Sequence, residues 1–292
     1  MDIFGVSPQL LLGQLLLGLI NGSFYAMLSL GLAVIFGLMN VVNFAHGAQY
    51  MLGAFVAWLL LTMFGVPYWG ALVIAPVVIA LFGMALERFL LRRLQNEDHL
   101  FGLLATYAVA LIVEGLVLHG YGSSGLPYTN PIPGGVMLGF MFLPYYRLWV
   151  VAISLVLCLG TWLLIERTKL GSYLRAANER SELVEAFGIN VPKLVTLTYG
   201  FGVGLAALGG VLAAPIYSVS PSMGTNMIVV VFAVVVIGGM GSIAGAIVSG
   251  YALGLAEGLT KVFYPAGANM TIFALMILAL MIWPSGLFSK AQ

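Results

Sequence analysis

The sequence predicts an all-α fold, a polytopic bundle of transmembrane helices that forms a single domain over residues 1–292. Two observations carry this prediction. The chain is 62% hydrophobic and only 7% charged, whereas soluble domains carry about 25% charged residues. Asp, Glu, Lys and Arg are also absent from two long stretches, 3–86 and 194–256. Since about 20 apolar residues cross a hydrocarbon core, each stretch is long enough for several crossings.

Composition argues against several other classes. A transmembrane β-barrel would alternate apolar and polar residues, whereas whole windows here are continuously apolar. We expect no cleavable signal peptide, because the chain begins with Asp2 rather than a basic cluster. Its single cysteine, Cys158, excludes an internal disulfide framework. The net charge of +1 implies neither an acidic nor a basic partner, and no nucleic acid is expected.

Most charged residues fall in two loops, 87–98 and 166–193. Both loops contain several Lys and Arg residues, and the positive-inside rule therefore assigns both to the cytoplasm. The segment between them, 115–146, carries no charge and is rich in Gly and Pro, which is typical of a turn-forming loop on the opposite side.

Counting outward from these loops gives nine apolar segments and an expected total of eight to ten spans, with the C-terminus in the cytoplasm. The first segment, 9–37, is too long for one straight crossing, and a break is predicted at Asn21-Gly22. Segments 226–240 and 243–261 are alternatively a short re-entrant pair. The remaining segments are 46–65, 69–90, 100–119, 148–165, 193–214 and 269–284.

Glycine spacing predicts where helices pack closely. Gly250, Gly254 and Gly258 recur every four residues and form one small ridge on a helix. Gly18 and Gly22 do the same near the start of the chain. Small residues at this spacing let another helix approach its backbone closely, so we expect both sets to serve packing.

Two hydrophobic segments, 40–54 and 238–252, are interrupted by polar or glycine residues, one in each half of the chain. Paired interruptions of this kind point to the site of a transporter built from two repeats. The residues expected to break the helices for structural reasons are Asn40, Asn43, Gly238, Gly239 and Gly241.

Polar residues inside the predicted spans are candidates for a transport path or gate, because such groups are costly in a membrane. Asn40, Asn43, His46 and Gln49 follow one another at steps of three. The first two are expected to satisfy backbone groups at a helix break. His46 and Gln49, with Glu114, are the path or gate candidates.

The same polar residues bear on other chemistries. Glu257 stands four residues before Lys261, a spacing that predicts an ion pair. No metal site is expected, because the three histidines have no spaced carboxylate or cysteine partner. The sequence GSSG at 122–125 matches a motif of intramembrane proteases, but no histidine follows it, and we interpret it as a chance match. No catalytic residue and no cofactor are predicted.

The charged loop 166–192 contains a predicted amphipathic helix over 173–187, ended by a left-handed cap at Gly188. Such a helix either lies on lipid or inserts into a groove of a partner protein. The second half of this helix is acidic, which argues against anionic lipid and favours a docking role.

Three blocks of sequence resemble the permeases of branched-chain amino-acid ABC transporters, of the LivH type that takes up hydrophobic amino acids. They are GLAVIFGLMNVVNFAHGAQYMLGAF at 31–55, RAANERSELVEAFGINVPKLVTLTYGFGVGLAALGGVLAAP at 175–215 and VVIGGMGSIAGAIVSGYALGLAEGL at 235–259. The stretch ALERFLLRR at 85–93 also fits.

The resemblance implies the permease fold of a bacterial ABC importer in the inner membrane. In that family a second homologous permease subunit, two cytoplasmic ATPase subunits and a periplasmic substrate-binding protein complete the system, within the lipid bilayer. The predicted helix is then the one that couples to the ATPase. Its implied coupling residues are Arg175, Glu179, Arg180, Leu183, Phe187 and Gly188.

The residues themselves agree that any ATPase is a separate subunit, and they leave alternatives open. A P-loop needs a lysine after glycine, and none of the four lysines follows one. Relatives of this family are proposed to carry urea, short amides or other small solutes, and the shared motifs do not separate these substrates. A proton-coupled secondary transporter that uses Glu114 or His46 as its proton carrier is the other alternative.

Overall fold

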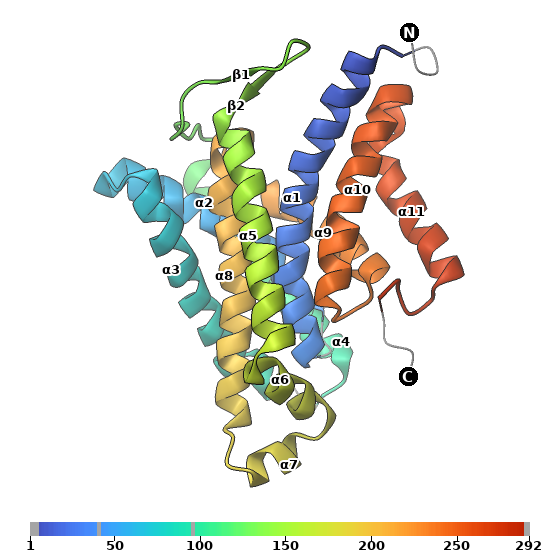
Figure 1. Ribbon diagram of the computed structural model, residues 1–292. Helices are drawn as coiled ribbons and strands as arrows, with labels where there is room; N and C mark the ends of the chain where they lie inside the picture. Colours follow the sequence, from blue (N-terminus) through green and yellow to red (C-terminus); the bar gives the residue numbers. More distant parts are fainter. Residues whose placement is uncertain (1–5, 40–41, 95–96, 289–292) are drawn as a thin grey trace.

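The computed structural model describes residues 6–39, 42–94 and 97–288, which form a bundle of α-helices (Figure 1). The helices are α1 (Pro8–Met39), α2 (Ala45–Phe64), α3 (Tyr68–Phe89), α4 (His99–Tyr121), α5 (Tyr145–Arg167), α6 (Lys169–Glu179), α7 (Ser181–Ala186), α8 (Val191–Tyr217), α9 (Met223–Gly238), α10 (Ile243–Phe263) and α11 (Ala268–Ile282). Two short 3-10 helices, η1 (Leu91–Leu94) and η2 (Pro265–Gly267), precede α4 and α11.

Eight helices of the described chain are long and apolar enough to cross a membrane, the last counted together with η2. Helix α9 is also apolar but has only 16 residues. The predicted all-α polytopic bundle is therefore confirmed, and the predicted segments agree with the observed helices to within a few residues at most ends.

The two charged loops lie at the same end of the bundle. Arg92, which follows α3, donates a hydrogen bond of 2.9 Å to the backbone carbonyl of Pro192, at the start of α8. Helices α6 and α7 form this end, and the start of α1 lies at the other (Figure 1). The uncharged segment between α4 and α5 also lies at the far end and contains an antiparallel hairpin of β1 (Gly135–Met137) and β2 (Phe142–Pro144).

Helices α1 and α10 pack backbone to backbone, as the glycine ridges predict. A Cβ added to Gly18 would lie 2.5 Å from the carbonyl oxygen of Gly254, and one added to Gly250 would lie 2.5 Å from the Cα of Ala26. The predicted break at Asn21-Gly22 is wrong, because α1 is one continuous helix of 32 residues. Gly22 serves this packing instead, since it lies against the backbone of Tyr251.

Helix α8 forms the centre of the other half of the bundle, between α2 and α3. A Cβ added to Gly53 of α2 would lie 2.5 Å from the Cα of Ala207, and one added to Gly200 would lie 2.5 Å from the Met84 side chain of α3. Such close approaches leave no room for a larger residue. Helices α2, α3 and α8 therefore pack closely against one another.

Helices α9 and α10 do not form a short re-entrant pair. Helix α10 has 21 residues and is one of the eight potential spans. The two helices are joined by a tight turn in which Gly239 and Gly241 have φ angles of 98° and 83°. These left-handed conformations favour glycine, so the turn requires the glycines that interrupt the hydrophobic segment.

The helix predicted over 173–187 is wrong as a single element. The chain forms α6 and α7 instead, separated at Arg180, whose φ and ψ angles are −148° and 84°. The break lets α7 change direction, so that Val184 is buried in the same apolar cluster as Leu174 and Ala177 of α6. The predicted left-handed cap is confirmed, since Gly188 has a φ angle of 83°.

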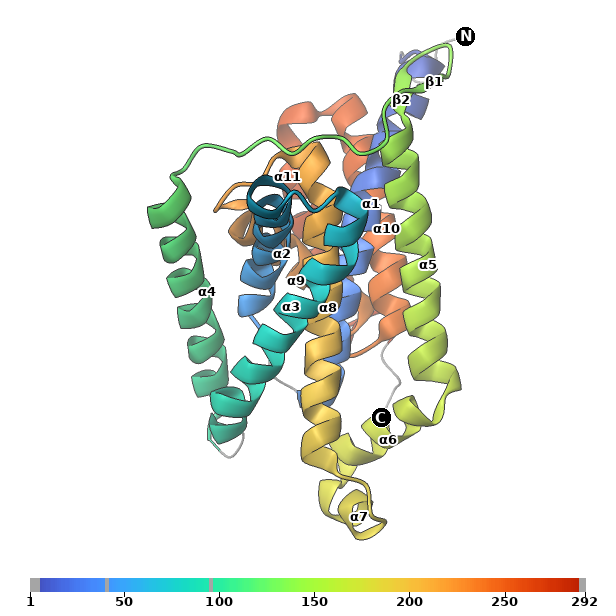
Figure 2. The same ribbon diagram turned by 90° about the vertical axis from the view of Figure 1, so that its left-hand side faces the viewer.

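Helix α4 stands apart from the other helices, at the edge of the bundle (Figure 2). Only 17% of its most apolar window is buried inside the protein, compared with 83% for α1. Its contacts are with α2, with η1 and with the start of α9. The space that α4 borders is the candidate functional site.

Candidate functional site

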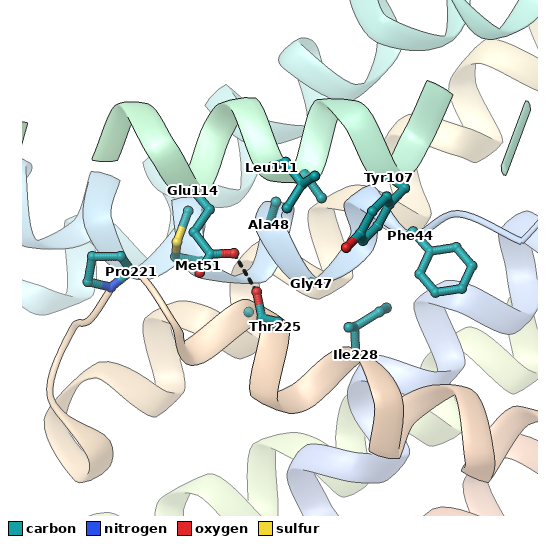
Figure 3. Close-up of a pocket in the computed structure, with 12 residues that line it drawn as sticks. Phe44, Gly47, Ala48, Met51, Tyr107, Leu111, Glu114, Pro221, Thr225 and Ile228 are labelled. Atoms are coloured by element: carbon teal, nitrogen blue, oxygen red, sulfur yellow. Dashed lines mark hydrogen bonds between the residues drawn. The ribbon is translucent and has the colours of Figure 1, made fainter. Parts of the chain in front are cut away.

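A cavity of about 60 Å³ lies between α4, the start of α2 and the start of α9 (Figure 3). Its walls are mostly apolar, and Glu114 is the one charged residue among the described residues that line it. The lining residues are Phe44, Gly47, Ala48, Met51, Tyr107, Ala110, Leu111, Glu114, Pro221, Gly224, Thr225 and Ile228. Pockets that hold small organic ligands occupy roughly 300–1,000 Å³, so this cleft is too small to hold such a ligand in the present structure.

The cleft lies inside the bundle because α2 begins there rather than at the end of α1. His46, in the first turn of α2, packs against Gly31 of α1, where an added Cβ would lie 3.0 Å from its Cε1 atom. Gly31 is eight residues before the last residue of α1, Met39, or about 12 Å along the helix axis. The chain therefore returns into the bundle before α2 starts.

The starts of α2 and α9 meet at a pair of glycines. A Cβ added to Gly47 would lie 2.5 Å from the carbonyl oxygen of Gly224. Any larger residue would separate the two helices, so glycine is required for this contact. Figure 3 shows Gly47 facing the α9 segment that carries Thr225.

Glu114 joins α4 to α9 across the cleft. Its Oε2 atom accepts a hydrogen bond of 2.5 Å from the Oγ1 atom of Thr225, as Figure 3 shows. Glu114 is half-buried and Thr225 is exposed. The hydrogen bond spans the mostly apolar cleft, so its loss would release an attachment of α4 to α9.

His46 does not face the cleft. Its side chain is buried, and its Nε2 atom lies 3.0 Å from the backbone carbonyl oxygen of Leu28 in α1. The neighbouring residues of α2, Gly47 and Ala48, line the cleft on the opposite side of the helix. His46 therefore fixes α2 to α1 in this conformation.

Gln49 belongs to a buried chain of amide and hydroxyl groups. Its Nε2 atom donates to the Tyr199 hydroxyl of α8 at 3.4 Å, and its Oε1 atom accepts from Asn43 Nδ2 at 3.3 Å. The Oδ1 atom of Asn43 accepts from the backbone N–H of Ala45 at 3.1 Å. This chain satisfies backbone and side-chain groups at the point where α2 starts and links α2 to α8.

The predicted path residues are therefore not brought together. Glu114 lines the cleft, whereas His46 and Gln49 lie on the far side of α2. Asn40 lies outside the described residues. Gly238, Gly239 and Gly241 are remote from the cleft, at the end of the bundle that contains α6, where Gly241 packs against Gly37 of α1.

An apolar groove of about 490 Å³ lies on the outer surface of α6 and α7. The large apolar side chains of Phe187 and Leu183 are 86% and 51% exposed there, although they lie within a charged loop. The lining residues are Tyr173, Ala176, Glu179, Arg180, Leu183, Val184, Phe187 and Ile189. Arg175 does not line it, because it pairs with Glu166 of α5 at 3.5 Å.

Sequence reasoning missed the partners of the polar residues it selected. Thr225, Thr106 and Tyr199 are hydroxyl residues within apolar segments, and each contacts a residue near the cleft. Thr106 of α4 accepts a hydrogen bond of 3.2 Å from the backbone N–H of Phe44. An isolated hydroxyl in a predicted span is common, so only the pairing distinguishes these three.

The fold and the cleft together define a class of protein. A bundle of potential membrane spans contains a small, mostly apolar cleft, its interior polar groups hold helix junctions, and one end presents an apolar groove. This combination is typical of the membrane subunit of a transporter.

Comparisons with known proteins name the family. Residues 14–282 match the family described as the permease component of branched-chain amino acid transport systems. The chain belongs to this family, as its sequence motifs predicted.

Three relatives illustrate the similarity. The chain is 29% identical to the high-affinity branched-chain amino acid transport system permease protein BraD of Pseudomonas aeruginosa, over 96% of both proteins. It is 28% identical to the corresponding protein LivH of Escherichia coli, also over 96% of both. It is 30% identical to a probable branched-chain amino acid transport permease protein LivH of Methanocaldococcus jannaschii, over 92% of this chain and 90% of that protein.

Proposed function

We propose that this chain is the permease subunit of a bacterial ABC importer that carries branched-chain or other hydrophobic amino acids across the inner membrane. The observation that carries this proposal is the family match over residues 14–282, which includes nearly the whole bundle. In this proposal the end that contains α6 and α7 faces the cytoplasm. The C-terminus lies on that same side.

The partners follow from the same proposal. Two ATPase subunits dock beneath the membrane, a periplasmic binding protein delivers the solute, and a second homologous permease completes the path. The exposed apolar groove on α6 and α7 supports a docked protein, because Phe187 and Leu183 present a large apolar surface beside Glu179 and Arg180. Amphipathic helices commonly recognise partner grooves by such anchors.

The cleft is the proposed place of gating. Glu114 lines the path between α4 and α9, and His46 and Gln49 hold α2 in the closed position. Withdrawal of α4 would break the hydrogen bond between Glu114 and Thr225 and widen an otherwise apolar passage. Apolar walls suit a hydrophobic side chain, and the binding protein makes the selective contacts.

Reconstitution into liposomes tests the function. The permease with its ATPase subunits and binding protein should accumulate leucine when ATP is supplied, and should take up neither urea nor short amides. Leucine uptake that persists without the ATPase and collapses with a protonophore would show a proton-coupled carrier instead. Uptake of urea in preference to leucine would assign the chain to another solute.

Phe187→Glu tests the docking surface. A charge in the middle of the groove should reduce ATP-driven uptake by about tenfold or more, since burying an unpaired charge is costly. Ser172→Glu is the matched control, because it adds the same single negative charge at an exposed position of α6 outside the groove. Equal uptake by both variants would remove the docking claim.

A further inference from the structure

A cluster of four residues, here named the Glu87 clasp, joins the end of α3 to the start of α8. It consists of Glu87, Arg92, Pro192 and Thr196. The Arg92 guanidinium donates from Nε and Nη2 to the two carboxylate oxygens of Glu87, both at 3.1 Å. Arg92 Nη2 also donates to the Pro192 carbonyl oxygen at 2.9 Å.

Thr196 completes the clasp on the α8 side. Its hydroxyl donates to Glu87 Oε2 at 2.6 Å and accepts from Arg92 Nη2 at 2.5 Å. One hydroxyl of α8 therefore bridges both members of the ion pair. Planar, two-pronged contacts between arginine and carboxylate are strong and directional, so they set the position of the groups that they join.

The carboxylate at the centre of the clasp is buried inside the protein. The side chain of Glu87 is fully buried, whereas that of Arg92 is 32% exposed. A buried carboxylate requires partners that hold its charge, and the clasp supplies three donor groups. Exposed ion pairs contribute little to stability, and this one differs because its carboxylate is buried away from solvent.

The α8 residues of the clasp follow shortly after the proposed docking segment, α6 and α7, in the chain. Helix α7 ends at Ala186 and α8 starts at Val191, so Pro192 and Thr196 lie in the first two turns of α8. Asn190 caps α8 by accepting from the backbone N–H of Lys193 at 2.9 Å. Any displacement of α7 therefore reaches the clasp through a short, capped connection.

The same face of α8 leads on to α2, one wall of the cleft. Tyr199 lies one helical turn beyond Thr196 and bonds to Gln49, which bonds to Asn43 at the start of α2. The α3 side is tied to α8 as well, since a Cβ added to Gly83 would lie 2.8 Å from the Val203 side chain. A continuous set of contacts thus runs from the docking segment to α2.

We propose that Glu87, Arg92 and Thr196 are positioning residues that make α3 and the start of α8 move as one body. Through them, ATP-driven displacement of α6 and α7 reaches α2 and opens the cleft. This inference rests on the proposed function, because it takes α6 and α7 as the docking segment.

The test uses the whole transporter complex and two pairs of matched variants. Thr196→Val removes the bridging hydroxyl and keeps the shape of the side chain, whereas Thr196→Ser keeps the hydroxyl. Arg92→Gln breaks the ion pair, and Arg93→Gln is its control, since Arg93 is the exposed neighbour in the same turn. Each variant is measured for co-purification with the ATPase, ATP hydrolysis and leucine uptake.

A further measurement does not depend on the solute. Ala48→Cys places a thiol in the cleft of a chain in which Cys158, the one native cysteine, is replaced by serine. Its rate of reaction with a thiol reagent, with and without ATP, reports the opening of the cleft.

Thr196→Val should still bind the ATPase and hydrolyse ATP within about twofold of the wild type, while uptake per ATP falls about tenfold, the effect of one charged hydrogen bond. The response of the Ala48→Cys label to ATP should be lost in the same variant. Thr196→Ser and Arg93→Gln should behave as the wild type, and Arg92→Gln as Thr196→Val.

The clasp proposal is overturned if Thr196→Val keeps the labelling response, or if it loses ATPase binding together with uptake, which would show a purely structural role. A wild-type complex that takes up no leucine contradicts the proposed function, and the labelling experiment then still decides the clasp. If Phe187→Glu and Thr196→Val both leave the labelling response to ATP intact, the proposed roles of the docking surface and of the clasp are both wrong.

Discussion

Helices α1 and α10 and helix α4 are all potential spans, but they are attached to the bundle in opposite ways. The α1 and α10 pair is held by backbone contact at five glycines, and 83% of the most apolar window of α1 is buried. Helix α4 is held mainly by apolar side chains and by hydrogen bonds at Thr106 and Glu114, with 17% of its window buried.

The difference separates a tightly packed frame from a loosely attached helix. Close backbone packing has one arrangement only, because no side chain can rotate to accommodate a shift. A helix attached through a few side chains can separate from its neighbours at modest cost. The cleft lies on the α4 side, so the proposed gating would involve movement of α4, with α1 and α10 as its support.

The largest effect is expected for Gly254→Ala in the frame. The new methyl group would overlap the backbone of Gly22, and we expect the free energy of unfolding to fall by about 3 kcal/mol, as for overpacked cores. Gly115→Ala is the matched control in α4, where an added Cβ meets nothing within 4 Å. Thermal unfolding in detergent micelles checks both, and equal destabilisation would end the distinction between frame and moving part.

Next in size is Tyr25→Phe, also in the frame. The Tyr25 hydroxyl donates to Glu257 Oε2 at 2.7 Å, and Glu257 pairs with Lys261 at 2.5 Å, the predicted ion pair. Loss of this donor should lower the free energy of unfolding by about 2 kcal/mol, because the acceptor is a buried carboxylate. Uptake per folded molecule should be unchanged. Tyr264→Phe, at an exposed position, should leave the unfolding temperature as it is.

A smaller loss of stability is expected for Thr106→Val, near the N-terminal end of α4. The variant leaves the backbone N–H of Phe44 without its acceptor. The free energy of unfolding should fall by about 1 kcal/mol. Thr106→Ser keeps the hydroxyl and should restore most of this stability. If the serine variant were no more stable than the valine variant, the hydrogen bond would not be what attaches α4 there.

The smallest change in stability is expected for Thr225→Val, which removes the bond to Glu114. Thr225 is exposed, so the free energy of unfolding should change by less than about 0.5 kcal/mol. The Ala48→Cys label should nevertheless react faster, because α4 is released from α9. Thr225→Ser provides the control, and a labelling rate unchanged by the valine substitution would show that this bond does not close the cleft.

The span pattern was predictable from sequence because hydropathy and charge act locally. Uncharged apolar stretches gave the helices, glycine spacing gave the α1 and α10 contact, and Gly188 gave the left-handed cap. The errors arose where distant residues decide the outcome. Asn21-Gly22 resembles a break, but the backbone of α10 needs that glycine inside a continuous helix.

The candidate site was predictable only in part for the same reason. His46, Gln49 and Glu114 were recognisable as polar residues in apolar segments, and no pattern in the chain indicated which of them share a cavity. The start of α2 inside the bundle turns His46 and Gln49 toward α1 and α8 and leaves Glu114 alone in the cleft. Thr225 and Tyr199, their unremarked partners, come from segments more than one hundred residues away.

Composition, charge placement and motifs were thus enough to identify a membrane-spanning permease of the branched-chain amino acid family. These features are carried by residues that are close in the chain, and each can be recognised without its neighbours in space. The small cleft, the break at Arg180 and the Glu87 clasp depend on contacts between separate helices. Only the packing of the helices determines which side chains meet there, because burial and pairing are properties of the folded bundle.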